Sequence, residues 1–127
     1  MTIILYVDGG TRGSVICLVD PYKKKTIVKK RRGKLTNNDL EYLALIYGLE
    51  YAKKHYPKGE RIIIKSDSKL IVNQVNGIWN INTDNLIFLA EKARIKKDEH
   101  DELSISWTPR ENNLAGIYLE DLKDKLK

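Results

Sequence analysis

The sequence has very little cysteine and no long apolar run. Cys17 is the single cysteine among 127 residues, which excludes a disulfide framework within the chain. We interpret it as a small buried hydrophobe and not as a nucleophile. No apolar run approaches the roughly 20 residues that a membrane-spanning helix needs. The first residues also lack the basic stretch and apolar segment of a signal peptide. These absences predict a cytoplasmic protein with no membrane partner.

Charge, by contrast, is abundant. Charged residues make up 31% and hydrophobic residues 42% of the chain, which is typical of a folded globular protein. The formal net charge of +6 favours a polyanionic partner. Many of the positive residues form what we call the basic run: Lys23, Lys24, Lys25, Lys29, Lys30, Arg31, Arg32 and Lys34. Two interpretations stay open, namely an edge strand that lysines protect from pairing with other chains and a nucleic-acid-binding patch.

The pattern of apolar residues predicts a single α/β domain over residues 1–127. Five strands are expected at residues 3–8, 14–19, 26–32, 61–66 and 103–107. Four helices are expected at residues 39–55, 67–76, 83–97 and 113 to the C-terminus. An antiparallel meander of three strands, followed by two helix–strand crossovers, gives a mixed five-stranded sheet. Its fourth and fifth strands are parallel, and helices cover both faces.

Some residues within these elements carry specific expectations. Gly9, Gly10 and Gly13 are expected in the turn after the first strand. Trp107 is interpreted as a core residue. In the last helix the inward-facing residues are expected to be Ala115, Leu119, Leu122 and Leu126.

Three acidic residues stand at the boundaries of the predicted elements. Asp8 ends the first strand, Glu41 lies at the start of the first helix, and Asp67 follows the fourth strand. Asp8 could be a turn residue and Asp67 an N-cap. Glu41 could form a capping box with Asn38. Carboxylates gathered at one edge of a sheet repel each other unless a cation neutralises them, and hard oxygen ligands suit Mg²⁺ together with substrate phosphate. Taken together, the three residues predict a metal site for phosphodiester chemistry.

Five segments, in order along the chain, resemble ribonuclease H of type 1. They are Tyr6–Gly10, Leu35–Tyr42, Lys65–Leu70, Asn73–Gly77 and Trp107–Asn112. This resemblance covers essentially the whole chain and implies a ribonuclease H-like fold. It also implies a metal-dependent endoribonuclease that cuts the RNA strand of RNA–DNA hybrids with Mg²⁺ or Mn²⁺. The catalytic, metal-binding carboxylates would be Asp8, Glu41 and Asp67.

The resemblance implies a set of substrate-binding residues as well. Amide, hydroxyl and basic groups of this kind contact phosphate or groove edges without reading sequence. The set comprises Gly9, Gly10, Thr36, Asn37, Asn38, Ser68, Lys69 and Arg110. Double-stranded RNA stays open as a further substrate, and no obligate protein partner is evident.

The chain also departs from the family pattern. The family's fourth carboxylate opens the last helix in an Asn-x-x-Ala-Asp stretch, and here the stretch Asn112–Gly116 places Gly116 at the Asp position. The segment from Arg110 is one residue shorter than usual. The loop after Arg12-Gly13 lacks the usual Asn-Pro-Gly. We therefore expect a two-metal site whose second position is weak. Glu120, one helical turn beyond Gly116, is the candidate compensating ligand.

Two functions from different classes follow. The first is a hybrid-cleaving endoribonuclease with weakened activity. The second is a catalytically impaired module of the same fold that binds hybrid or duplex. A third reading, a DNA-directed relative such as an integrase or resolvase, is disfavoured by the early position of Glu41.

Overall fold

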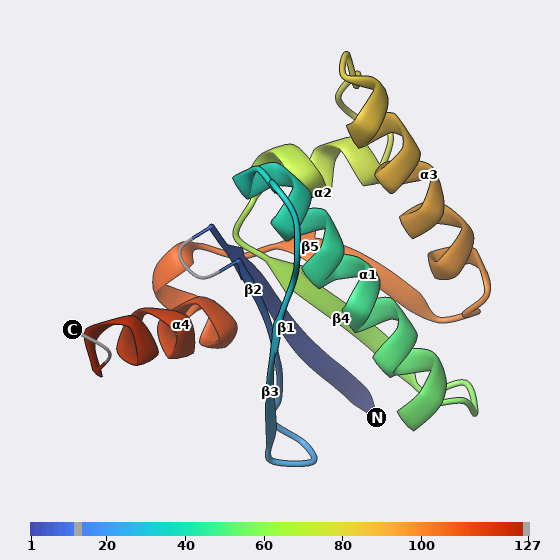
Figure 1. Ribbon diagram of the computed structural model, residues 1–127. Coiled ribbons are helices and arrows are strands. Elements are labelled where there is room, and N and C mark those ends of the chain that lie inside the picture. The colour runs from blue at the N-terminus through green and yellow to red at the C-terminus, as the bar shows by residue number, and fades with distance from the viewer. Residues whose placement is uncertain (12–13, 126–127) are drawn as a thin grey trace.

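The computed structural model describes residues 1–11 and 14–125, so the expected turn residue Gly13 and the expected inward-facing Leu126 lie outside the described residues. One mixed sheet of five strands has the order β3-β2-β1-β4-β5 (Figure 1). The strands are β1 (Thr2–Gly10), β2 (Val15–Asp20), β3 (Lys25–Lys30), β4 (Arg61–Ser66) and β5 (Leu103–Trp107). β2 is antiparallel to β1 and β3, whereas β4 is parallel to β1 and β5. This is the predicted topology.

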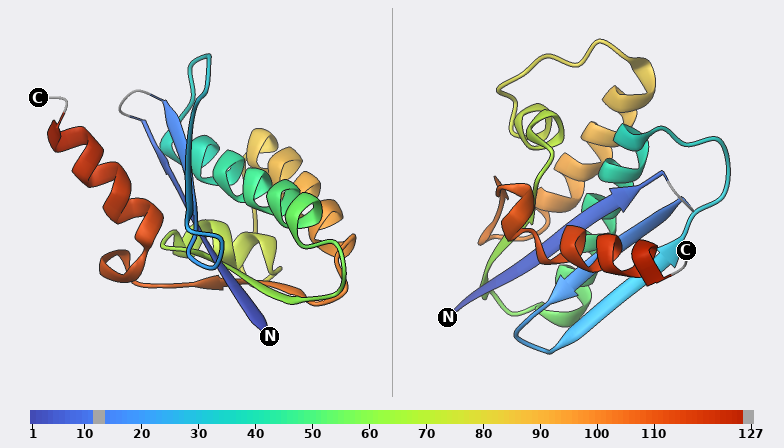
Figure 2. Two further views of the ribbon diagram at one scale, coloured as in Figure 1. Left: turned by 90° about the horizontal axis from the view of Figure 1, so that it is seen from below. Right: turned by 90° about the vertical axis from the view of Figure 1, so that its left-hand side faces the viewer.

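Helices cover both faces of the sheet, as predicted (Figure 2). They are α1 (Asn37–His55), α2 (Lys69–Val75), α3 (Asp84–Asp98) and α4 (Leu114–Lys125), with a short 3₁₀ helix, η1, at Arg110–Asn112. α1 packs on β1 and β2, α3 packs on α1, and α4 crosses the opposite face over β1 and β2. Among the helices in the described parts of the chain, none combines the length and apolar character that a membrane span requires.

The core lies between the sheet and α1. Side chains that alternate along the neighbouring strands β1 and β4, such as Leu5 and Ile64, are fully buried. Leu40 and Leu45 of α1 are also fully buried, because this helix is enclosed between the sheet on one side and α3 on the other. This packing fixes the start of α1 beside the C-terminal ends of β1 and β4, where parallel neighbours end at the same edge.

Several expected boundaries are wrong by a few residues, for local reasons. Gly9 and Gly10 belong to β1 and not to the turn, because β2 continues opposite them and pairs with both. β3 ends at Lys30 rather than at residue 32. α2 begins at Lys69 rather than at residue 67, since the Ser68 side chain caps it by accepting a hydrogen bond from the Ile71 N–H at 3.3 Å.

Candidate active site

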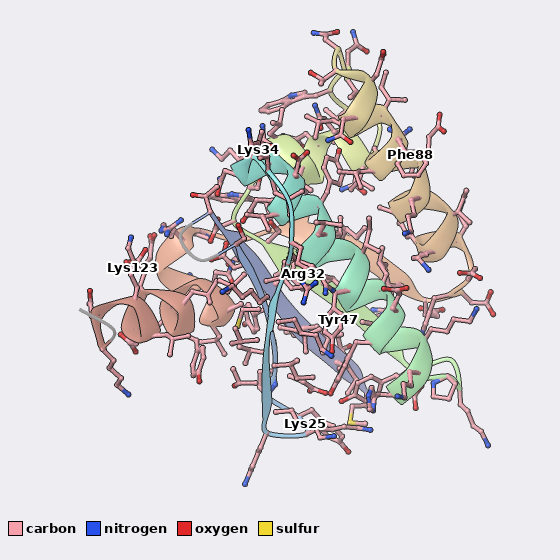
Figure 3. The ribbon with its side chains drawn as sticks, viewed as in Figure 1. Lys25, Arg32, Lys34, Tyr47, Phe88 and Lys123 are labelled. Carbon is pink, nitrogen blue, oxygen red and sulfur yellow. The ribbon has the colours of Figure 1, made fainter. Side chains whose placement is uncertain are left out.

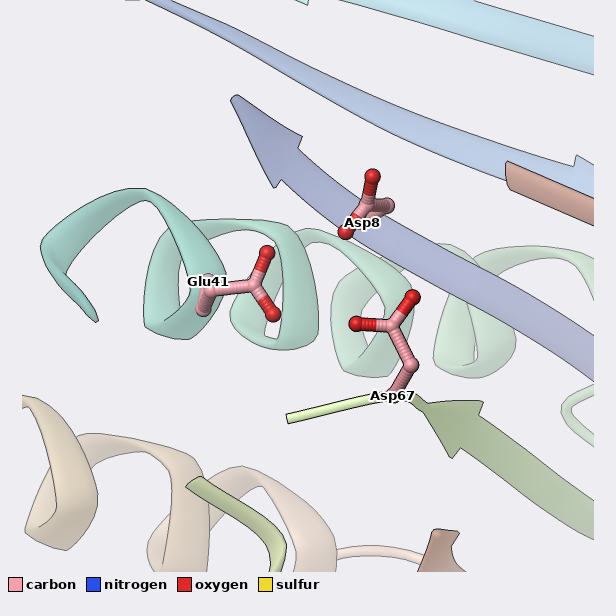
Figure 4. Close-up of side chains that lie close together, drawn as sticks. All are labelled: Asp8, Glu41 and Asp67. Carbon is pink, nitrogen blue, oxygen red and sulfur yellow. The ribbon is translucent and has the colours of Figure 1, made fainter. Parts of the chain in front are cut away.

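Three carboxylates converge at the edge where β1 and β4 end. Asp8 lies in β1, Glu41 in the first turns of α1, and Asp67 directly after β4. One carboxylate oxygen of each lies within 4.8 Å of the other two, and the three side chains point into a common space (Figure 4). Asp8 and Glu41 are buried and Asp67 is partly buried. The sequence predicted this convergence, and the structure confirms it.

None of the three follows the structural explanation that the sequence left open. Asp8 sits inside a paired strand, opposite Cys17, and so is not a turn residue. The capping box of α1 joins Thr36 to Asp39 and does not involve Asn38. Asp67 does not cap α2, because Ser68 does. The three carboxylates therefore serve neither a turn nor a helix cap in the structure.

Gly9 brings α1 close enough for Glu41 to join the site. A Cβ atom at Gly9 would lie 2.5 Å from the Leu40 backbone carbon, so any larger residue would push the helix away from the strand. The Gly9 N–H donates a hydrogen bond to Glu41 Oε1 at 2.8 Å. Gly9 thus orients one carboxylate of the cluster through its backbone, a role that the substrate-binding expectation did not include.

Asn113 holds Asp67 in place from the opposite face of the sheet. Its side chain is fully buried, and its Nδ2 donates to Asp67 Oδ2 at 2.9 Å and to the Val7 carbonyl at 3.0 Å. Its Oδ1 accepts from the Ala115 N–H at 3.1 Å, which secures the start of α4. Sequence reasoning missed this residue. The Asn before a helix was the available signal, but its partners lie far away along the chain.

Trp107 is a second residue that sequence reasoning misplaced. The expected core residue is 41% exposed, because it ends β5 at the edge where the site opens. Its indole N–H donates to the Asp67 carbonyl at 3.1 Å, and the Lys69 ammonium lies 4.7 Å from the centre of its ring. Lys69, an expected phosphate contact, therefore rests on an aromatic face beside the site.

Without a cation, burial makes the ionised form of these carboxylates unfavourable. Desolvation raises the pKa of Glu41, and the negative charge of Asp8 raises it further. Desolvation likewise raises the pKa of Asp8, with Asp67 adding to the effect. Both shifts have the sign expected when buried negative charges crowd together. A divalent cation bound among these oxygens would remove the penalty, so the donor set fits a hard metal ion.

The cluster opens into a groove of about 570 Å³. Most of the expected substrate-binding residues lie near it, and Gly9, Gly10, Asn37, Ser68 and Arg110 line it directly. Thr36 is exposed and engaged in capping α1, and Asn38 is half-buried beside it. The other side of the groove is formed by α4, through Leu119, Glu120, Leu122 and Lys123.

Gly116 lies against the carboxylates, at the position where the family pattern has its fourth acid. A Cβ atom at Gly116 would lie 3.3 Å from Asp67 Oδ2 and 3.4 Å from Asp8 Oδ2. A side chain at this position would thus enter the cluster. Glu120, the candidate compensating ligand, lines the groove but forms an ion pair with Arg110, at 2.9 Å between Oε1 and Nη2.

The basic run follows the edge of the sheet. β3 is an edge strand, and Figure 3 shows Lys25, Arg32 and Lys34 spread along it and along the segment that leads to α1. Lys29 lies over the Tyr47 ring, 5.7 Å from its centre. The position fits both expectations, a protected edge and a cationic surface that leads toward the site.

Comparisons with known proteins agree with this geometry. The family model described as "Reverse transcriptase-like" matches residues 8–119. The bifunctional protein Rv2228c of Mycobacterium tuberculosis is 30% identical over 121 residues, which cover 89% of this chain and 33% of that protein. The chain thus spans about a third of the length of this curated relative.

Two solved structures are similar over nearly their whole length. RNase H1 from the halophilic archaeon Halobacterium salinarum is 30% identical, with a TM-score of 0.77 over 98% of this chain and 99% of that one. LC11-RNase H1, solved in complex with an RNA/DNA hybrid, is 28% identical, with a TM-score of 0.77 over the same shares of both chains.

Proposed function

Because this chain belongs to the ribonuclease H family, we propose that it is an endoribonuclease that uses a divalent metal to cleave the RNA strand of RNA–DNA hybrids. The observation that carries the proposal is the convergence of Asp8, Glu41 and Asp67 within 4.8 Å of one another. They lie at the wall of an open groove. The hybrid bound in the LC11-RNase H1 structure supports the same class of substrate.

We assign the metal-binding role to the three carboxylates. Asp8, on the central strand β1, would hold the cations together with Glu41 and Asp67. Mg²⁺ is the proposed cofactor, with Mn²⁺ as a substitute, because all the ligands are hard oxygens. A cation held there would supply an activated water and would stabilise the leaving 3′ oxygen. The second cation position is weak, since Gly116 contributes no carboxylate.

The residues around the groove would bind the nucleic acid backbone. Asn37, Ser68 and Arg110 line the same groove and offer amide, hydroxyl and guanidinium groups. Such contacts position a duplex without reading its sequence. The start of α1 adds free backbone N–H groups that favour phosphate. Discrimination for RNA would then rest on duplex shape and the 2′-hydroxyl, which leaves double-stranded RNA as a further substrate.

A labelled RNA–DNA hybrid, incubated with the purified protein and Mg²⁺ or Mn²⁺, tests the proposal. We expect internal cuts in the RNA strand, with 3′-hydroxyl and 5′-phosphate ends, and no cuts in EDTA or with Asp8→Asn. Ends that carry a cyclic phosphate would indicate attack by the 2′-hydroxyl and contradict the assignment. Parallel reactions with double-stranded RNA and double-stranded DNA define the substrate range.

Gly116 keeps the second candidate function open. Tight binding of hybrid without cleavage in either metal would identify a binding module of the same fold. The cytoplasmic localisation expected from the sequence also stays a proposal, which fractionation of the source cells tests.

A further inference from the structure

Glu120 stands on the face of α4 that meets the carboxylates. It follows Gly116 by four residues within one continuous helix, and residues with this spacing share a helix face. A Cβ atom at Gly116 would lie 3.3 Å from Asp67 Oδ2 and 3.4 Å from Asp8 Oδ2. Helical side chains lean toward the N-terminus and cover the preceding turn. The Glu120 side chain therefore projects over the space that the missing side chain of Gly116 leaves beside the cluster.

In the structure, the Glu120 carboxylate forms an ion pair with Arg110. Its Nη2 lies 2.9 Å from Glu120 Oε1, and the two side chains are 63% and 50% exposed. Ion pairs this exposed are weak, so the partner can be exchanged. Arg110 also lines the same groove as Asp8 and Asp67.

We propose that Glu120 is the fourth ligand of the metal centre and that Arg110 is its competitor. Without cations, Glu120 pairs with Arg110. When a second divalent cation binds beside Gly116, Glu120 leaves the guanidinium for the cation, and Arg110 becomes free to contact a phosphate of the substrate. Because each binding event breaks the Arg110–Glu120 pair, this exchange weakens the second position further, beyond the loss of a carboxylate at Gly116. The inference rests on the proposed function for the metal site, and it adds a partner exchange that couples metal and substrate binding.

Counting bound Mn²⁺ in the absence of nucleic acid tests this exchange. Electron paramagnetic resonance of free Mn²⁺ gives the number of bound ions and the affinity of each. We expect a tight first step and a weak second step in the wild type. Arg110→Ala should tighten the second step roughly threefold to tenfold, since it removes both the competing partner and a nearby positive charge. Glu120→Gln should remove the second step and leave the first in place.

The double variant and a matched control separate this from a general charge effect. Arg110→Ala combined with Glu120→Gln should behave like Glu120→Gln alone, because Arg110 acts on the second cation mainly through Glu120. Arg61→Ala removes an arginine that pairs with Glu102 at the other end of β4, at 3.5 Å, and should change neither step.

The proposal is overturned if the second Mn²⁺-binding step is unchanged in Glu120→Gln. It is also overturned if this step is weaker in Arg110→Ala than in the wild type, or cannot be detected there. These measurements need no cleavage. If the protein fails to cut hybrids, the proposed function is contradicted, but the Mn²⁺-binding result can still be interpreted. If the protein cuts hybrids and Glu120→Gln keeps the second Mn²⁺-binding step, the partner exchange alone is contradicted.

Discussion

Replacing Asp8 by Asn should stabilise the metal-free protein while it abolishes cleavage. The Asp8 side chain is 5% exposed and shares a small space with Glu41 and Asp67. Desolvation is the main cause that raises its pKa from 3.8 to about 6. A carboxyl group whose pKa is higher in the folded state favours folding at low pH and opposes it once both states ionise. The wild type should therefore lose stability as the pH rises from about 4 through about 6, and the neutral amide of the variant avoids this loss.

The size of the effect follows from the shift. Each pKa unit corresponds to about 1.4 kcal/mol, so ionised Asp8 costs the metal-free protein about 2–3 kcal/mol at pH 8. For a chain of this length we expect the Tm of Asp8→Asn to exceed that of the wild type by roughly 5–10 °C. The difference should be small near pH 4. Saturating Mg²⁺ stabilises only the form that binds it, so it should reduce or reverse the difference.

Thermal unfolding followed by circular dichroism measures the Tm difference between Asp8→Asn and the wild type. It is measured under three conditions: in EDTA at pH 4, in EDTA at pH 8, and with Mg²⁺ at pH 8. Asp20→Asn is a matched control. Asp20 is buried like Asp8, but it accepts hydrogen bonds from the Tyr51 and Tyr56 hydroxyls at 2.7 Å, so its replacement should lower the Tm. A stability difference for Asp8→Asn that does not grow between pH 4 and pH 8 would refute the charge-crowding argument.

Three further predictions concern the same edge of the protein. Gly116→Asp should increase Mg²⁺-dependent cleavage and lower the metal-free Tm, because it adds a carboxylate in contact with the cluster, whereas Gly116→Ala adds the same Cβ atom and should not raise activity. Asn113→Ala should destabilise the protein by about 2–4 kcal/mol in denaturant unfolding, because the Val7 carbonyl, the Asp67 carboxylate and the Ala115 N–H lose their hydrogen bonds to this side chain. A loss under about 1 kcal/mol contradicts this. Hybrid binding by the inactive Asp8→Asn variant should weaken steeply between low and physiological salt, with a smaller slope after Lys29→Ala and Lys30→Ala. An affinity that stays flat with salt would remove the basic run from binding.

Sequence patterns could predict the topology here because each strand and helix carries its own periodic signal. β5 begins and ends at the expected residues, because apolar and polar residues alternate along it and a turn region lies on each side. The three carboxylates could also be predicted, because each follows or opens such an element and parallel strands end at one edge. The apolar run of β1 also made this strand recognisable: Ile3, Leu5 and Val7 are buried, and the residues between them are half-buried.

What the sequence could not predict depends on contacts between distant segments. Gly9 resembled a turn residue because glycine favours turns, but here the close approach of α1 requires it inside a strand. Asn113 joins α4 to Val7, 106 residues away, and no local pattern encodes such a bond. The exposure of Trp107 depends on where the helices stop covering β5.

The two hydrogen bonds that hold the carboxylates explain how the cluster keeps its geometry without a cation. Glu41 accepts from the Gly9 N–H, and Asp67 accepts from Asn113. Such bonds orient ligands before the ion arrives. The Gly9 N–H also opposes the rise in the pKa of Glu41 that desolvation and the neighbouring negative charges cause. Since Asn113 also fixes the first turn of α4, the ligand geometry at Asp67 and the placement of Gly116 and Glu120 depend on one side chain. A shift in the start of α4 would therefore change both sides of the proposed metal site together.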